Sequence, residues 1–160
     1  MRHKLFTSFF SSAYTSAALV ACCILSITAC ATYPTQELSD ARQAVRAAEA
    51  IEANKHLPEI YNKAASLLTN AEEKLSTSPP HYSEARTAAL AAKDNAIKAR
   101  LLTVALLDAN KTIKKLQSSD TPLTEAKQAL EKAHYAIKID SFDEAIKYAE
   151  LAKNLALQGR

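Results

Sequence analysis

Glycine is almost absent from this chain. Of its 160 residues only Gly159 is a glycine, whereas alanine, leucine, lysine and glutamate are abundant. The abundant types are strong helix formers, and glycine supplies most of the positive-φ turns that tight loops need. The composition therefore predicts an all-α fold and largely excludes turns that demand a positive φ.

Apolar residues recur at three- and four-residue steps along most of the chain, which is the spacing of one helix face. Prolines and Ser/Thr clusters interrupt this pattern at Pro58, at residues 76–80 and at residues 119–122. We therefore expect an alanine-rich helical domain over 35–160, with helices at about 35–55, 58–77, 81–118, 122–139 and 141–158.

Residues 81–118 hold the longest uninterrupted helical pattern. A single helix of this length would be about 57 Å long, as in coiled coils and helical repeats. The alternative is a turn hidden near residues 108–110. One apolar stripe follows the segment at Ala85, Ala89, Ala92, Ala96, Ala99, Leu102, Leu106, Ala109, Ile113 and Leu116.

Two stretches of the chain resemble each other. The apolar positions of 64–75 are matched 62 residues later, and those of 82–96 are matched 60 residues later. An aromatic residue, then Glu-Ala, then alanines on one face is similar to the second helix of a tetratricopeptide hairpin, although that repeat has a period of about 34 residues. We expect antiparallel helical hairpins, tetratricopeptide-like or in a bundle, around one long central helix. A shared composition without duplication is the alternative explanation.

Residues 1–29 have the pattern of a secretory signal peptide, with a basic start, a limited apolar core and a small residue at the end. The apolar run is shorter than the roughly 20 residues of a membrane-spanning helix. Its end, Leu-Ser-Ile-Thr-Ala-Cys at 25–30, resembles the lipobox of bacterial lipoproteins. The resemblance implies cleavage after Ala29 and lipidation of Cys30 by palmitate-like acyl chains. An uncleaved anchor and a free thiol at Cys30 are the alternatives.

Residues 30–34 would form the lipidated N-terminus and a short tether, whose last four residues reach about 14 Å when extended. The domain would therefore lie close to the membrane. Ala31 follows Cys30, in place of the aspartate linked with inner-membrane retention in enteric bacteria. By this resemblance we expect a location at the outer membrane, with the domain facing the periplasm.

The start of the mature chain carries a second resemblance. Residues 34–44, the apolar pattern of 64–75 and the Tyr-Ser-Glu-Ala at 82–85 are similar to short envelope lipoproteins that carry a helical module catalogued as domain of unknown function 4398. The resemblance covers residues 30–100 and departs from the family at 53–56, where a Gly-Ala usually ends the first helix. It implies an envelope role, sometimes beside OmpA-like proteins, and no established catalytic or binding residue.

No residues have the spacing of a catalytic or metal site. The three histidines beyond the leader, His56, His81 and His134, lie far apart in the sequence, whereas metal-binding histidines recur at short intervals. Adjacent carboxylates such as Glu72 and Glu73 do not face each other on a helix. We therefore expect no enzymatic activity, no metal and no cofactor.

Arg86, Lys93 and Arg100 recur every seven residues. This cationic stripe is a candidate contact with an anionic surface, such as lipid headgroups or a cell-wall polymer. An ordinary solvated helix face is the alternative. Without Arg2 and Lys4 of the leader, the chain has a net charge of only +1, so it gives no argument for nucleic-acid binding.

These patterns predict a lipid-anchored, non-catalytic scaffold or adaptor that binds another envelope protein. The alternative is a structural lipoprotein whose long helices self-associate and contact peptidoglycan or anionic lipid.

Overall fold

The computed structural model describes residues 32–117 and 123–158. The leader 1–29, Ala29 and Cys30 therefore lie outside the described residues. Within the described ranges the chain forms helices and no strand, which confirms the all-α prediction. The helices are α2 (Thr35–Glu49), α3 (Ala53–His56), α4 (Pro58–Ser76), α5 (Tyr82–Leu116), α6 (Thr124–Lys138) and α7 (Phe142–Gln158).

The first helix departs from its expected span of 35–55. α2 ends at Glu49, and Glu52 has φ 60° before the one-turn helix α3 begins. A left-handed residue cannot continue a right-handed helix, so the chain turns here. Pro58 then begins α4, at a position where its missing N–H removes no helical hydrogen bond.

Positive-φ turns occur without glycine, in contrast to the expectation from composition. Glu52 and Asp140 have φ values of 60° and 57°. The carboxylate of Glu52 accepts a hydrogen bond from Lys55 Nζ at 2.7 Å. After Asp140, the Ser141 N–H reaches back to the Ala136 carbonyl at 2.9 Å and closes the end of α6. Local hydrogen bonds thus support a conformation that costs a residue with a Cβ roughly 1–2 kcal/mol.

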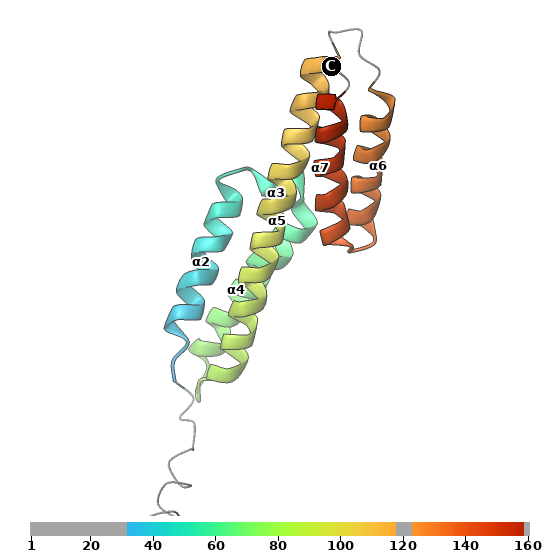
Figure 1. Cartoon of the computed structure of the whole chain (residues 1–160). Helices are drawn as coiled ribbons and strands as arrows, with labels where there is room; N and C mark the ends of the chain where they lie inside the picture. Colours follow the sequence, from blue (N-terminus) through green and yellow to red (C-terminus); the bar gives the residue numbers. More distant parts are fainter. Residues whose placement is uncertain (1–31, 118–122, 159–160) are drawn as a thin grey trace, which may run out of the picture. The chain divides into compact units, whose positions relative to one another are not determined.

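α5 is one helix of 35 residues, so the turn considered near 108–110 is absent. Its length is about 52 Å. Figure 1 shows α2 and α4 beside its first half and α6 and α7 beside its second half. Every residue of the apolar stripe predicted from the sequence is buried in this helix.

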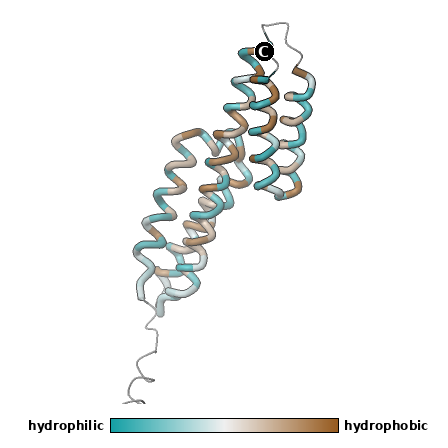
Figure 2. The backbone as a smooth tube through the Cα atoms, viewed as in Figure 1, coloured by the Kyte–Doolittle hydropathy of each residue, from teal (hydrophilic) through white to brown (hydrophobic). Residues whose placement is uncertain are grey.

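The described helices form two groups of three that share α5. We call α2, α4 and residues 82–97 of α5 the N-terminal module, and residues 102–116 of α5, α6 and α7 the C-terminal module. Alanine dominates the buried positions of both, and small side chains let the helix backbones approach closely. The hydropathy colouring of Figure 2 shows apolar and polar residues alternating along every helix, as expected for amphipathic packing.

The two modules bury corresponding residues. The repeat seen in the sequence relates α4 to α6 and the first half of α5 to α7, and the structure adds a third pair, α2 and the second half of α5, at a separation of 68. Both members are buried in each pair: Leu38 and Leu106, Ala41 and Ala109, Val45 and Ile113, Ala48 and Leu116, Ala64 and Ala126, Ala71 and Ala133, Ala85 and Ala145, Ala89 and Ala149, Ala92 and Ala152, Ala96 and Ala156.

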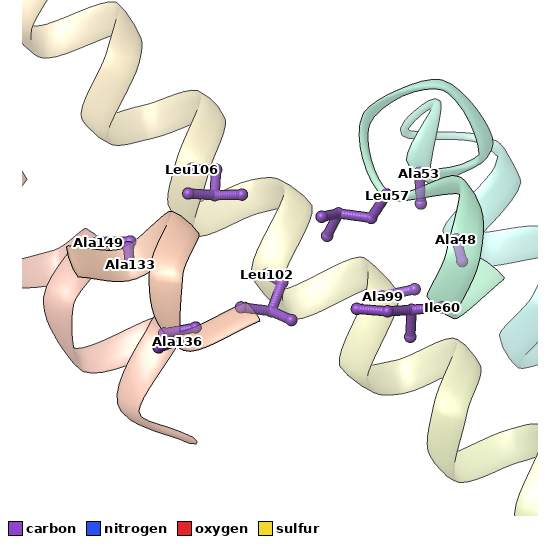
Figure 3. Packing of buried hydrophobic residues seen from close by; sticks show 11 residues of the cluster. Ala48, Ala53, Leu57, Ile60, Ala99, Leu102, Leu106, Ala133, Ala136 and Ala149 are labelled. Atoms are coloured by element: carbon purple, nitrogen blue, oxygen red, sulfur yellow. The ribbon is translucent and has the colours of Figure 1, made fainter. Parts of the chain in front are cut away.

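One apolar cluster joins the modules at the middle of α5. Leu102 is fully buried there, and Leu106 is nearly so. In Figure 3 Leu102 projects from α5 between Ala136 of α6 and Ile60 of α4. The turn between α6 and α7 therefore packs near the beginning of α4, and α5 supplies the large side chains between them.

Candidate interaction surface

One face of α5 is apolar and uncovered in the described structure. Leu90, Leu101 and Val104 are each 45% exposed, and Ile97 between them is half-buried. Their spacing of seven, four and three residues places them on a single helix face. We call these four residues the α5 strip. Single exposed apolar residues are ordinary, but an aligned set is typical of an interaction site.

The α5 strip is exposed because α5 packs against a different pair of helices in each half. In its first half, Ala89, Ala92 and Ala96 pack against α2 and α4, whereas in its second half Leu106 and Ile113 pack against α6 and α7. These two buried sides differ in direction around the helix axis, because helical positions advance by 3.6 residues per turn. The α5 strip lies on the side that neither pair of helices covers.

A groove of about 320 Å³ lies between α2 and α5 beside the strip. Ile97 belongs to both features. Ala44 and Ala47 give the α2 wall a small-residue surface, and Arg100 stands on the opposite wall. The complete lining is Asp40, Gln43, Ala44, Ala47, Lys93, Ile97 and Arg100.

The predicted cationic stripe is divided by its contacts with α2. Arg86 Nε lies 2.7 Å from Glu37 Oε1, and Lys93 Nζ lies 2.8 Å from Asp40 Oδ2. These two cations therefore have carboxylates beside them, which offsets much of their field. Arg100 forms no ion pair within residues 32–117 and 123–158 and lines the groove. Of the three predicted contacts, Arg100 is therefore the one whose charge no neighbouring carboxylate offsets in the described residues.

The ion pairs shift the titration of their members. The pKa of Glu37 is lowered by a backbone hydrogen bond and by Arg86. The hydrogen bond from Lys93 lowers the pKa of Asp40 and, reciprocally, raises the pKa of Lys93. All three groups are therefore charged at neutral pH and hold α2 to α5.

A second concavity, of about 270 Å³, lies where the two modules meet. Its walls combine apolar residues with charged ones from α3, α4 and the turn between α6 and α7. They are His56, Leu57, Pro58, Glu59, Ile60, Lys63, Asn95, Ile137, Asp140 and Phe142. Lys98 covers the outer side of Phe142, with Nζ 5.7 Å from the ring centroid.

In the described part of the chain, no group of three or more His, Cys, Asp or Glu side chains is arranged to hold a metal ion. Likewise, none of the described helices is both long and apolar enough to span a membrane. The fold does not bring together the three histidines beyond the leader, which lie in different parts of the structure: His56, His81 and His134.

The sequence did not single out the α5 strip. Leu101 and Val104 are next to positions of the buried stripe in the sequence. A helix with apolar residues on two sides is expected to be buried on both, whereas α5 is exposed on one. The sequence did contain a signal for it: Leu90, Leu101 and Val104 are apolar but do not belong to the buried stripe that includes Ala99 and Leu102. Such an excess over one helix face indicates a second contact surface.

Comparisons of the chain with protein-family models, with curated proteins and with solved structures gave no match.

Proposed function

We propose that the protein is a lipid-anchored, non-catalytic adaptor on the periplasmic side of the outer membrane, and that the α5 strip binds a helix of another envelope protein. The lipobox-like residues 25–30 support the anchor. The observation that carries the binding role is the exposed alignment of Leu90, Leu101 and Val104. An apolar helix face beside a groove suits an amphipathic helix as partner.

Charge narrows the chemistry of that partner. Arg100 borders the strip, whereas Asp40 on the other wall of the groove is already engaged by Lys93. A partner helix with an apolar face and acidic residues along one edge would place its carboxylates near Arg100. Charge pairs at the rim of an interface favour the correct orientation and faster association. The partner is therefore an acidic amphipathic helix.

The anchor is tested by replacing Cys30 with alanine. In the wild type we expect intact mass to show a triacylated N-terminal cysteine, with the protein in the outer-membrane fraction. The Cys30→Ala variant should be released or remain unprocessed, because it lacks the acceptor thiol. An unlipidated wild-type product, or one that retains its leader, would remove the anchor from the proposal.

The binding face is tested with a photo-crosslinking residue at position 101. We expect crosslinks to a membrane-associated partner, mapping to an acidic amphipathic helix, and their loss when Val104→Asp is added. Position 151 is a matched control, because Leu151 is 44% exposed on α7, close to the 45% of Leu101. Equal crosslinking at both positions would refute a specific role for the strip.

Self-association is the second candidate function. The spacing of the α5 strip would also suit two copies of α5 side by side, as in a coiled coil. Such a structural lipoprotein would contact peptidoglycan or anionic lipid through its remaining surface, with Arg86, Lys93 and Arg100 as the proposed contacts. Sedimentation distinguishes the two candidates. If the protein self-associates, Leu101→Asp should convert a dimer to a monomer; if it binds another protein, both the wild type and the variant should be monomers.

The arrangement of the chain is also part of this proposal. We infer that the α4–α5 and α6–α7 pairs are duplicated hairpins, related in their packing to tetratricopeptide hairpins. The matched burial of the two modules supports duplication. The resemblance to domain of unknown function 4398 fits the same envelope setting, and a signal peptide over 1–29 completes it.

A further inference from the structure

The two modules differ in what covers the beginning of their last helix. Phe142 begins α7 and packs into the apolar cluster that joins the modules. The corresponding residue of the N-terminal module is Tyr82, which begins α5. Among residues 32–117 and 123–158, no further module lies against Tyr82. This end of the repeat, which is a packing surface in the C-terminal module, is left open in the N-terminal module.

Tyr33 partly covers this open end. Its ring meets the ring of Tyr82 edge to face, with centroids 5.9 Å apart and planes at 62°. Pro34 next to it is fully buried, and the Leu38 N–H donates to the Pro34 carbonyl at 3.1 Å. The chain is therefore fixed to the bundle from residue 33 onward, while 54% of the Tyr33 side chain stays exposed.

The turn at this end of the N-terminal module lacks acidic side chains. Residues 75–83 contain no carboxylate, and of the acids that flank them Glu84 Oε2 contacts Lys74 and Glu72 contacts Arg42, whereas Glu73 is exposed. The corresponding turn of the C-terminal module carries Asp140 and Asp143, where the N-terminal module has Pro80 and Ser83. A turn without carboxylates limits repulsion by anionic headgroups, and tyrosine rings favour the membrane interface.

The short chain between Cys30 and Tyr33 indicates which surface this end contacts. Only two residues separate Cys30 from Tyr33, which limits the distance from the anchor to the fixed chain to about 10 Å. We infer that Tyr33, Tyr82 and the turn between α4 and α5 lie against the lipid headgroups, so that α5 points away from the membrane and carries the C-terminal module outward. This inference rests on the proposed lipidation of Cys30.

The experiment uses the exported, purified full-length product in vesicles of phosphatidylethanolamine and phosphatidylglycerol that contain spin-labelled lipid. A fluorophore is attached to Ser83→Cys near the turn or to Gln158→Cys at the end of α7, both exposed positions. We expect strong quenching of the label at 83 and little at 158. Equal quenching, or stronger quenching at 158, would overturn the inferred orientation.

A variant series isolates the tyrosines. Tyr33→Ala with Tyr82→Ala should reduce quenching at 83 and increase it at 158, because the anchored domain loses its fixed contact. Tyr33→Phe with Tyr82→Phe should keep most of the orientation, and Tyr135→Ala, a control at a tyrosine 65% exposed on α6, should change nothing. Unchanged quenching in the double alanine variant would remove the tyrosines from the inference.

Intact mass distinguishes the two possible failures. A lipidated Cys30 with equal quenching at both labels overturns only the orientation. A product without lipid at Cys30 overturns the anchor and, with it, the orientation.

Discussion

The N-terminal and C-terminal modules use one packing plan with different chemistry at the same positions. In both, a lysine of the last helix pairs with an aspartate of the first: Lys93 with Asp40 at 2.8 Å, and Lys153 with Asp108 at 2.9 Å. A second pair differs. Arg86 and Glu37 form an ion pair in the N-terminal module, whereas Ile146 and Ala105 stand at the corresponding positions and pack against the cluster that joins the modules.

This difference separates what the fold requires from what it tolerates. Every buried residue of the last helix is an alanine in both modules, so close approach is the shared requirement. The neighbouring contact is the ion pair of Arg86 and Glu37 in the N-terminal module, where solvent reaches it. In the C-terminal module it is the apolar contact of Ile146 and Ala105, which packs against the cluster between the modules. Desolvation explains the exchange, because a charge removed from water loses more free energy than a pair returns unless its geometry is ideal.

The largest expected effect comes from Leu102, whose side chain lies in the apolar cluster that joins the two modules. Leu102→Ala should destabilise the protein by about 2–5 kcal/mol, because it removes a fully buried side chain and leaves a cavity between the modules. Urea unfolding followed by circular dichroism measures this loss. If the two modules unfold together in the wild type, the variant should also separate them into two transitions.

The neighbouring residue is the matched control for this variant. Leu101→Ala removes the same number of atoms from a side chain that is 45% exposed, and a surface change of this kind costs within about 0.5 kcal/mol. A similar loss of stability in both variants would show that the shared cluster does not join the modules.

The sequence predicted the helical class and every buried apolar position of α5, because apolar spacing reports which side of a helix is covered. It did not predict the burial of Thr103, which is polar and lies outside the apolar stripe. It also placed most helix boundaries within two residues of the observed ones. It missed the end of α2, since Glu52 is an ordinary helix former whose left-handed conformation depends on its surroundings.

The candidate surface was less predictable than the fold. Spacing placed Arg86, Lys93 and Arg100 on one side of α5, but the carboxylates of Glu37 and Asp40 that offset two of them come from α2. A single helical pattern contains no information about which neighbouring helix lies beside it. For the same reason the exposure of the α5 strip became visible only with α2, α4, α6 and α7 in place.

A smaller effect is expected at Thr103, because the corresponding residue of the N-terminal module begins a helix and Thr103 does not. Thr103 corresponds to Thr35, the exposed first residue of α2, but lies fully buried inside the continuous α5. Its hydroxyl has no hydrogen-bond partner in the described structure. Thr103→Val should therefore stabilise the protein by about 1 kcal/mol, since an unsatisfied buried hydroxyl is costly.

Thr112→Val is the control, because the Thr112 hydroxyl donates to the Asp108 carbonyl at 2.8 Å. Chemical denaturation of both variants should show a gain only at position 103. A loss of stability in Thr103→Val would mean that its hydroxyl is satisfied after all.

The smallest expected effect comes from making one module resemble the other. Glu37→Ala with Arg86→Ile places the residue types of Ala105 and Ile146 in the N-terminal module. We expect a melting temperature close to that of the wild type and a weaker dependence on salt, because ion pairs that solvent still reaches contribute little and are screened. Glu37→Ala alone should lower the melting temperature more than the double change, since it removes the carboxylate and keeps the cation.

Acid titration sharpens this last comparison. The pKa values of Glu37 and Asp40 are lowered in the folded protein, so their pairs stabilise it fully above the ordinary carboxyl pKa of about 4 and less as pH falls through the folded values. The melting temperature of the wild type should therefore decrease with acidification, and that of the double variant should decrease less. The remaining dependence reports the other carboxyls whose pKa is lowered, which are Asp40 beside Lys93, Glu52 beside Lys55 and Glu84 beside Lys74. Adding Asp40→Asn should remove only the share of Asp40. An unchanged acid dependence in the double variant would show that the pair of Glu37 and Arg86 does not distinguish the modules.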